Sequence, residues 1–514
     1  MESAPLETLD RRFSFFNREF SLERIFLFLI LLSAVFLRIY RIADYMEFLG
    51  DQGRDVVIVA RFLKQGDLMF IGPQTSIGNM YLGPWYYYLI APALLLADFN
   101  PVGPALMVAL IGVATVWLVW LAAKQLFGKT TALLSALFFA VSPVAVYYSI
   151  FSWNPNMMPF FALLSVWLTW LIWQKNELKK IPFLTFSLAM ALNSHYLGLL
   201  LFPPAVFFLF LTWVKNRKTN QNNPFFQPLV IGVLVFLLLM SPLLIFDLKH
   251  QFANFKSILA FFAIRQTTVN FKVYKGILLL PKVANQLLSN LFLRKDFWPP
   301  FYWFIPVFFL AGLKARKSKS FWFLLIWLLT GLIGLSNYKQ HVYAHYFGFL
   351  WPAAIILTAF LLTKLFWFLF LPLIFALTYL ALINWHGWQP ANFQLKRAEK
   401  IAEFIIDQSS GQEFALALIA EMNYDPPYRY FIDLKKGSLI DLHQKMAGQL
   451  FVICEPWGKV DCSPVGHPQW QVAAFGWAQI DQEWEIEGVK VFRLIHYQSE
   501  LVSRPCLTVI RDHA

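Results

Sequence analysis

The sequence predicts a polytopic α-helical membrane protein with about 11 transmembrane helices, interfacial helices in its external loops and a small C-terminal extracytoplasmic α/β domain. Three observations predict this fold class. Of the 514 residues, 58% are hydrophobic and only 14% are charged, whereas soluble proteins carry about 25% charged residues. Uncharged runs close to the roughly 20 residues that span a bilayer recur along the chain. After about Ala391 the composition becomes that of a soluble domain.

These features divide the chain into three parts. Residues 1–23 are expected to form a polar cytoplasmic tail without a cleavable signal, because the hydrophobic segment that follows has no small-residue cleavage site. Residues 24–390 form the transmembrane domain, with a first external loop at 42–101 and a long external loop at 247–296. Residues 391–514 form the extracytoplasmic domain.

The membrane spans follow from the uncharged runs. Ile181–Val214 would be about 51 Å long as a single helix, more than a ~30 Å hydrocarbon core, so we expect a hairpin that turns at Asn193–Tyr196. Tyr81–Ala97 is expected to lie on the membrane or to re-enter it, because a full span there would place the basic segment Lys124–Lys129 outside. Other expected spans are Val102–Ala123, Thr131–Ile150, Met157–Trp173, Pro224–Phe246, Phe297–Leu313, Phe321–Tyr338, Tyr346–Thr363 and Leu365–Asn384.

Short basic loops set the orientation, because Lys and Arg accumulate in cytoplasmic loops. Such loops begin at Lys124, Lys175, Lys215 and Lys314. With all four inside, the N-terminus is cytoplasmic and the C-terminal domain is outside a plasma membrane. The same rule accounts for the net charge of +13, so nucleic acid is not expected as a partner.

The long external loop is basic and breaks this pattern. Phe252–Ile264 and Ile277–Leu293 are expected to be interfacial amphipathic helices. Their cations either bind anionic lipid head groups or capture a lipid-linked phosphate, and Arg265 is a candidate for the second role. Arg38 and Arg41 are expected to snorkel at the end of the first helix.

A short acidic motif, Leu49-Gly50-Asp51-Gln52-Gly53-Arg54-Asp55, follows the first hydrophobic segment. We interpret Gly50 to Gly53 as a turn that holds Asp51 at the membrane interface. Val56–Gln65 is then an amphipathic helix on the membrane surface, capped by Asp55. The alternatives are that Asp51 is itself a helix cap, and that Arg54 only pairs with a neighbouring carboxylate instead of binding substrate.

The motif, the surface helix and the aromatic segment Tyr81–Tyr86 occur in the order found in the first external loop of the GT-C glycosyltransferases. The chain resembles this superfamily over Arg24–Asn384, and the protein mannosyltransferase and aminoarabinose transferase branch most closely. The resemblance implies inverting transfer of a sugar from a polyprenyl-phosphate donor to an extracytoplasmic hydroxyl of a protein, lipid or glycan. It implies that Asp51 is the general base.

The resemblance also bears on cofactors. Many members of the superfamily have two adjacent acidic residues, whereas Gln52 follows Asp51 here. A neutral amide replaces a hard anionic ligand, which disfavours a divalent metal. We therefore expect no cofactor.

Other polar residues fall on the external side. Each has a structural alternative: the Asn-Pro-Asn sequence also serves as a helix stop and start, and His195 lies at a helix turn. The basic residues near 340 are expected to dock the lipid phosphate. The candidate substrate-binding residues are Arg54, Asp55, Asn154, Asn156, His195, Tyr196, Arg265, Lys339, His341, His345 and Tyr346.

Two other functional classes remain open. A polyprenyl-linked glycan flippase or transporter would place charges within its spans, and the long uncharged runs disfavour it. A glycan ligase or polymerase would depend on a late external loop, whereas the sharper motif here is in the first.

The C-terminal region shows no catalytic pattern. It is expected to contain a helix at Leu395–Ser409 and strands at Phe414–Ala420, Gln449–Glu455 and Lys490–Leu494. Cys454 and Cys462 either form a disulfide there or remain free and buried.

Overall fold

The computed structural model describes residues 14–15, 18–19, 22–75, 80–218, 225–264, 268–270, 273–293 and 304–497. The chain forms two compact units, each built from two stretches of sequence. The helical unit comprises Met1–Glu47 and Ile58–Phe393, and the soluble unit comprises Phe48–Val57 and Gln394–Ala514. Helix α3 (Gly50–Gln65) is therefore shared between the two units.

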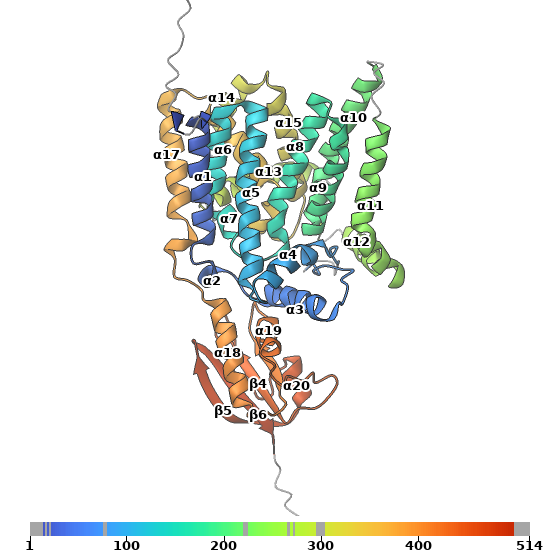
Figure 1. Cartoon of the computed structure of the whole chain (residues 1–514), viewed down its shortest axis with the longest axis vertical. Coiled ribbons are helices and arrows are strands. Elements are labelled where there is room, and N and C mark those ends of the chain that lie inside the picture. The colour runs from blue at the N-terminus through green and yellow to red at the C-terminus, as the bar shows by residue number, and fades with distance from the viewer. Residues whose placement is uncertain are drawn as a thin grey trace, which may run out of the picture. The chain divides into compact units, whose positions relative to one another are not determined.

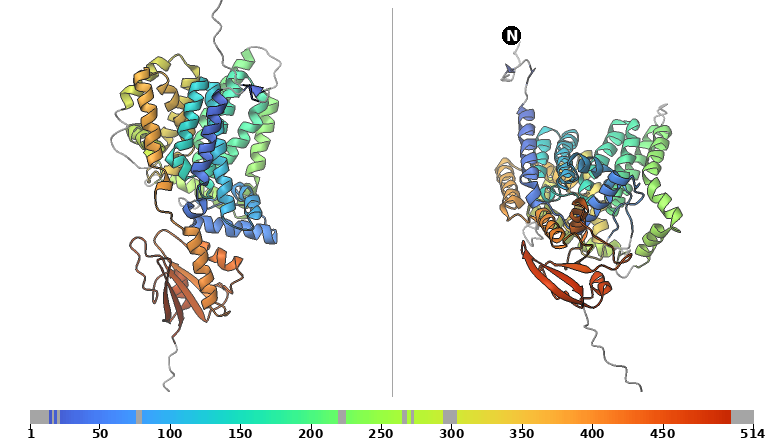
Figure 2. Two further views of the ribbon diagram at one scale, coloured as in Figure 1. Left: turned by 60° about the vertical axis from the view of Figure 1, so that its left-hand side comes forward. Right: turned by 60° about the horizontal axis from the view of Figure 1, so that its bottom comes forward.

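The helical unit is a bundle in which α1, α5, α8, α9 and α11 follow one another side by side (Figures 1 and 2). Six helices of the described residues are long and apolar enough to cross a membrane. This confirms a polytopic helical fold. The helices are α1 (Leu22–Ile39), α2 (Ile42–Tyr45), α4 (Trp85–Leu96), α5 (Val102–Phe127), α6 (Lys129–Val141), α7 (Pro143–Tyr147), α8 (Met158–Lys175), α9 (Ile181–Ser194), α10 (Phe202–Lys218), α11 (Phe226–Lys249), α12 (Ala253–Ala263), α13 (Val273–Leu293), α14 (Phe304–Ala315), α15 (Lys319–Ser336), α16 (Trp351–Leu362) and α17 (Trp367–Ile383).

The centre of the bundle is α6, which packs against α1, α5 and α16. Small buried residues such as Ala132, Ala136 and Ala140 allow these helices to approach closely. The expected span Thr131–Ile150 is not one continuous helix, because α6 ends at Val141 and α7 begins at Pro143. Proline has no backbone N–H to continue the helical hydrogen bonds.

Two other sequence expectations agree with the helical unit. Ile181–Val214 is a hairpin: α9 ends at Ser194, and the 3-10 turn η3 (Tyr196–Leu201) leads into α10. Helix α4 is about 18 Å long, too short to cross the membrane core, and it packs against α5 and α9.

The long external loop differs in part from expectation. Helix α12 is largely exposed, in agreement with an interfacial helix. Helix α13 is instead packed against α15, α7 and α17, with Leu287, Leu291 and Phe292 buried. Its segment Gly276–Leu293 is long and apolar enough to span a membrane, so its interfacial position stays a prediction. The expected span Phe297–Leu313 is represented only by α14, since 294–303 lie outside the described residues.

Arg38 does not snorkel. Its side chain is completely buried on α1. The guanidinium donates hydrogen bonds to the carbonyl oxygens of Ala140 at 2.9 Å and Phe139 at 3.2 Å, both in the last turn of α6. Arg41, three residues later, is exposed and pairs with Asp44 at 2.8 Å.

The soluble unit contains a four-stranded mixed sheet in the order β3-β4-β6-β5. Strands β3 and β4 are parallel, and the other neighbouring pairs are antiparallel. The three predicted strands and the predicted helix are present, whereas β5 was not predicted. The elements are α18 (Gln394–Gln408), β3 (Ala415–Ile419), α19 (Pro426–Leu434), β4 (Gln449–Cys454), α20 (Trp470–Phe475), β5 (Ala478–Ile486) and β6 (Val489–His496).

The sheet is covered on both faces. On one face, Leu450, Val452 and Phe492 pack against α20 through Val472 and Phe475. On the other face, Phe404 of α18 contacts Trp484, which in turn stacks on Phe451. Strands β3 and β4 are buried along their whole length, which explains why they read in the sequence as continuous apolar runs.

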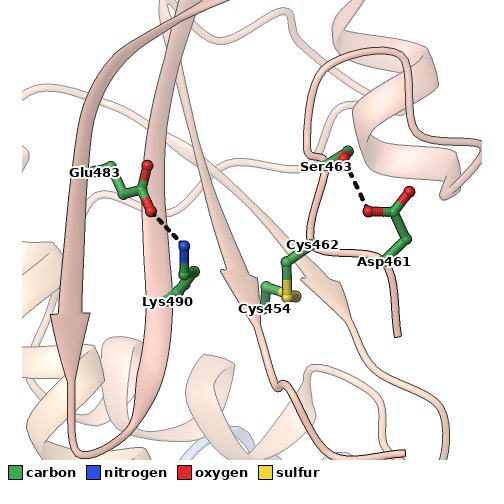
Figure 3. Close-up of a disulfide and its surroundings, with 6 residues drawn as sticks. All are labelled: Cys454, Asp461, Cys462, Ser463, Glu483 and Lys490. Atoms are coloured by element: carbon green, nitrogen blue, oxygen red, sulfur yellow. Dashed lines mark hydrogen bonds and ion pairs between the residues drawn. A yellow bond between two sulfur atoms is a disulfide. The ribbon is translucent and has the colours of Figure 1, made fainter. Parts of the chain in front are cut away.

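Cys454 and Cys462 form a disulfide (Figure 3), which decides between the two alternatives left open by the sequence. Cys454 is the last residue of β4, and Cys462 lies in the following loop. Beside it, the Ser463 hydroxyl donates to Asp461 at 2.8 Å. The disulfide therefore fixes the loop that leaves the central strand of the sheet.

Candidate active site

The acidic motif is the first turn of a helix. Helix α3 begins at Gly50, so Asp51 lies in its first turn and Asp55 lies inside it. The interpretation of Gly50 to Gly53 as a turn and of Asp55 as the helix cap is therefore wrong. An acidic residue in a first turn interacts favourably with the positive end of the helix dipole.

Arg54 joins the two carboxylates of this turn. Its Nη1 donates to Asp51 Oδ1 at 2.9 Å, and its Nη2 donates to Asp55 Oδ1 at 2.7 Å. The Asp55 side chain is 1% exposed, whereas that of Asp51 is 39% exposed. The buried carboxylate of Asp55 thus holds the guanidinium of Arg54 in place. Arg54 in turn binds the partly exposed carboxylate of Asp51.

A residue from the C-terminal part of the same unit completes this group. The Tyr424 hydroxyl donates a hydrogen bond to Asp51 Oδ1, and Arg54 Nη1 lies 3.4 Å from the same hydroxyl. Burial raises the pKa of Tyr424, and the nearby Asp51 carboxylate raises it further, although Arg54 lowers it. The phenol therefore keeps its proton at neutral pH. Among the described residues, Arg54 and Tyr424 both bind the Oδ1 atom of Asp51.

In the helical unit, several predicted residues meet in an aromatic–histidine cluster centred on His345. The His345 ring lies 4.6 Å from the Trp153 ring, 4.6 Å from the Tyr346 ring and 6.1 Å from the His195 ring, between centroids. These residues come from three separate connections between helices. The cluster consists of Tyr148, Trp153, His195, Tyr343, His345 and Tyr346.

Both histidines of the cluster are neutral at physiological pH. Burial lowers the pKa of His345 to about 3, and the neighbouring His195 lowers it further. Burial likewise lowers the pKa of His195 to about 4. The cluster therefore offers flat aromatic faces and neutral ring nitrogens, and its histidines do not supply positive charge for a phosphate.

The two asparagines of the Asn-Pro-Asn sequence are buried. Asn154 Nδ2 donates to the carbonyl oxygen of Ser194 at 2.8 Å, which ties its loop to the end of α9 beside His195. Asn156 Nδ2 donates to the carbonyl oxygen of Phe151 at 2.9 Å. Both amides therefore shape the connection that carries Trp153, and their contacts are structural.

Tyr196 lies next to the cluster but points toward other loops. Its hydroxyl donates to the carbonyl oxygen of Tyr81 at 2.5 Å and accepts from Asn254 Nδ2 at 3.2 Å. Asp247 in turn accepts the backbone N–H of Asn254 at 2.7 Å. Tyr196 therefore links the first external loop to the start of α12.

The predicted basic residues lie on an exposed connection after α15. The backbone N–H of Lys339 donates to the carbonyl oxygen of Thr268 at 2.9 Å. His341 is exposed, and its ring lies 4.5 Å from the Tyr343 ring, which stacks on His345. Ring contacts through Tyr343 therefore connect His341 to the aromatic–histidine cluster. Arg265 lies outside the described residues.

Sequence analysis missed two kinds of residue. Trp153 and Tyr343 lie within two residues of predicted site residues in the sequence. This closeness could have identified them as members of the cluster. Tyr424 gave no such signal, because it lies in an ordinary Asn-Tyr-Asp-Pro sequence far along the chain. Glu47, which accepts a hydrogen bond from the Tyr147 hydroxyl in the helical unit, was also missed. The described residues contain no group of three or more His, Cys, Asp or Glu side chains suited to hold a metal ion.

Comparisons with known proteins agree with this architecture. Residues 82–246 match the sequence family described as dolichyl-phosphate-mannose-protein mannosyltransferase. ArnT from Cupriavidus metallidurans bound to undecaprenyl phosphate is similar with a TM-score of 0.59 at 13% identity, over 91% of this chain and 97% of that one. Its apo state gives a TM-score of 0.58 at 13% identity and the same coverage.

A second protein shares the fold. The oligosaccharyltransferase of Archaeoglobus fulgidus in complex with Zn and sulfate is similar with a TM-score of 0.51 at 14% identity, over 84% of this chain and 68% of that one. No curated protein sequence matches the chain. The resemblance to GT-C glycosyltransferases of the mannosyltransferase and ArnT branch is thus confirmed, and the chain has their fold.

Proposed function

We propose that this protein is a glycosyltransferase of the membrane that moves a sugar from a polyprenyl-phosphate carrier to an acceptor hydroxyl. The observation that carries the proposal is the Asp51 carboxylate. Arg54 and Tyr424 bind its Oδ1, and the side chain remains 39% exposed. Proton abstraction from a hydroxyl requires a base that is held in one orientation and remains accessible to the acceptor.

The reaction is an inverting displacement. Asp51 Oδ2 takes the proton of the acceptor hydroxyl as its oxygen bonds to the anomeric carbon of the sugar. The bond from that carbon to the phosphate oxygen breaks, and the carrier leaves as polyprenyl phosphate. Arg54 orients Asp51, and Asp55 keeps Arg54 in place, because charge-assisted hydrogen bonds are short and strong.

The choice of donor is supported by the similar proteins. The matched family is described by its use of a dolichyl-phosphate sugar, and one similar structure contains undecaprenyl phosphate. Lys339 is the proposed cation for the donor phosphate, and the exposed His341 is a proposed hydrogen-bonding partner of the same phosphate. We assign the aromatic–histidine cluster to binding of the sugar or the first carrier units, which stack on flat apolar faces.

The site is proposed to face the extracytoplasmic side. The charge pattern of the loops supports this orientation. So does the disulfide between Cys454 and Cys462 in the soluble unit, because disulfides persist in oxidising compartments.

The test is Asp51→Asn in the full chain, assayed in proteoliposomes with radiolabelled polyprenyl-phosphate sugars and cell-envelope acceptors. Loss of a general base lowers the rate by about 100-fold or more. Asp44→Asn is the matched control, since Asp44 is an acidic residue of the same loop that pairs with Arg41. Full transfer by Asp51→Asn with every active donor would exclude this mechanism. Translocation of the donor without covalent transfer would instead indicate a flippase.

A further inference from the structure

The soluble unit supplies the cap of helix α3. Gly50 is the first residue of this helix, so its backbone N–H has no partner within the helix. Asn423 Oδ1 accepts that N–H at 2.8 Å, across a separation of 373 residues. The same oxygen accepts the backbone N–H of Tyr424 at 2.9 Å. Asn423 thus fixes the start of α3 and the backbone of Tyr424 with a single atom.

Asn423 is held by a buried acid. Its Nδ2 donates to Glu455 Oε1 at 2.9 Å, and the Tyr428 hydroxyl donates to the same oxygen at 2.6 Å. Glu455 is 5% exposed and directly follows Cys454 at the end of β4. Burial raises the pKa of Tyr428, and Glu455 raises it further, so this phenol remains a donor. The cap is therefore built on the central strand of the soluble sheet.

The two glycines of the acidic motif make room for this segment. A Cβ atom at Gly50 would lie 2.2 Å from the Tyr424 ring, and one at Gly53 would lie 2.4 Å from the backbone nitrogen of Pro427. Residues three apart lie on the same face of a helix. Gly53 lies within α3, where a glycine costs about 1 kcal/mol relative to alanine, so its presence on this face indicates that the close contact with Pro427 is required.

We propose that the segment Asn423–Pro427 of the soluble unit positions the reacting carboxylate: Asn423 fixes the first turn of α3, and Tyr424 orients Asp51. The proposal rests on the proposed function of Asp51. Tyr424 is a positioning residue in this scheme, because it acts through Asp51 Oδ1 while Oδ2 takes the proton. The soluble unit is therefore part of the catalytic apparatus.

This role has a kinetic signature. Without the Tyr424 hydroxyl, Asp51 retains Arg54 but gains freedom to rotate about its Cβ–Cγ bond. A less well-oriented base slows the chemical step and leaves the binding of donor and acceptor unchanged. A merely structural contact would instead change stability, or kcat and KM together.

The experiment compares Tyr424→Phe with the wild-type full chain in proteoliposomes, using the polyprenyl-phosphate sugar that the wild type transfers. We expect kcat to fall about tenfold or more with KM unchanged, as for the loss of one hydrogen bond to a charged group. Tyr497→Phe is the matched control, since Tyr497 is a 63% exposed tyrosine of the same unit; it should keep wild-type kcat.

Gly50→Ala is the second variant. It displaces the Tyr424 ring without removing any polar group, and it should also lower kcat. Gly448→Ala is its control, because a Cβ at Gly448 meets no atom within 4 Å.

The outcomes separate the two proposals. Full activity of Asp51→Asn refutes the proposed function, and with it the role of Tyr424. Inactive Asp51→Asn combined with wild-type kcat in Tyr424→Phe refutes the positioning role alone. A rise in KM at constant kcat in Tyr424→Phe also refutes it, because Tyr424 would then contact substrate directly.

Discussion

Replacing Arg38 by methionine should destabilise the helical unit strongly. Arg38 is completely buried on α1 and donates to the carbonyl oxygens of Phe139 and Ala140. The Phe139 carbonyl would normally accept the N–H of residue 143 in a continuing helix, but that residue is Pro143. The guanidinium of Arg38 therefore takes the place of the backbone N–H that Pro143 lacks. It also lies at the C-terminal end of α6, where positive charge is favourable.

The magnitude follows from the groups that lose their donor. Methionine fills a similar volume but donates nothing, so two buried carbonyl oxygens are left without the guanidinium. Each unsatisfied buried group costs about 1–3 kcal/mol. We expect the free energy of unfolding to fall by about 2–6 kcal/mol. Arg38→Lys should be intermediate, because an ammonium group lacks the fork that reaches two carbonyls.

The assay is chemical or thermal unfolding of the purified full chain in detergent. Arg41→Met is the matched control: Arg41 sits at the same helix end but is exposed, and its pair with Asp44 is a surface pair. It should remain close to the wild type. A midpoint for Arg38→Met equal to that of Arg41→Met would refute this account of the α6–α7 break.

Two further predictions concern other parts of the molecule. Cys462→Ser should lower the free energy of unfolding of the soluble unit by about 2.5 kcal/mol, since the disulfide with Cys454 closes a loop with a sequence separation of 8. Hydrogen exchange of β4 peptides in the full chain measures this change. Exchange equal to that of the wild type would contradict the prediction. Stability of the helical unit should be independent of His345 above about pH 6.5 and should fall as the pH drops toward 3, because burial lowers the pKa of His345 to about 3 and the unfolded chain binds the proton first. Denaturant unfolding between pH 4 and 8 measures this loss, and His345→Gln should reduce it; an equal loss in that variant would assign the pH dependence to other groups.

Hydropathy and charge were sufficient for the fold class and for most of the helices. The hairpin of α9 and α10 followed from length and charge, because no single helix of that length fits the membrane and both ends of the segment are basic. The break after Val141 was less visible, since Ser142 and Pro143 lie within an apolar run and proline occurs inside other helices of this chain, such as α11 at Pro242. At the break after Val141, the buried Arg38 of α1 donates hydrogen bonds to the carbonyl oxygens of Phe139 and Ala140. Arg38 is far from Pro143 in the sequence, so this support could not be predicted.

The candidate site was predicted in part for a similar reason. Polar residues at helix ends were visible as interruptions of apolar runs, and His195, His345 and Tyr346 do meet in one cluster. Their charge state was not predictable, because the burial that neutralises both histidines arises from packing between distant connections. The partners of Asp51 were equally hidden: Arg54 is a neighbour on the same helix, but Tyr424 is 373 residues away.

The misreading of the acidic motif shows how glycine should be interpreted in such sequences. Glycine suggests a turn because it adopts positive φ angles readily, and glycines such as Gly66 and Gly128 do so here. Gly50 and Gly53 are not among the positive-φ residues of the described chain, and both are helical. Their common property is a spacing of three, which places them on one helix face against Tyr424 and Pro427. The motif therefore encodes an acid together with the clearance that lets a distant segment reach it.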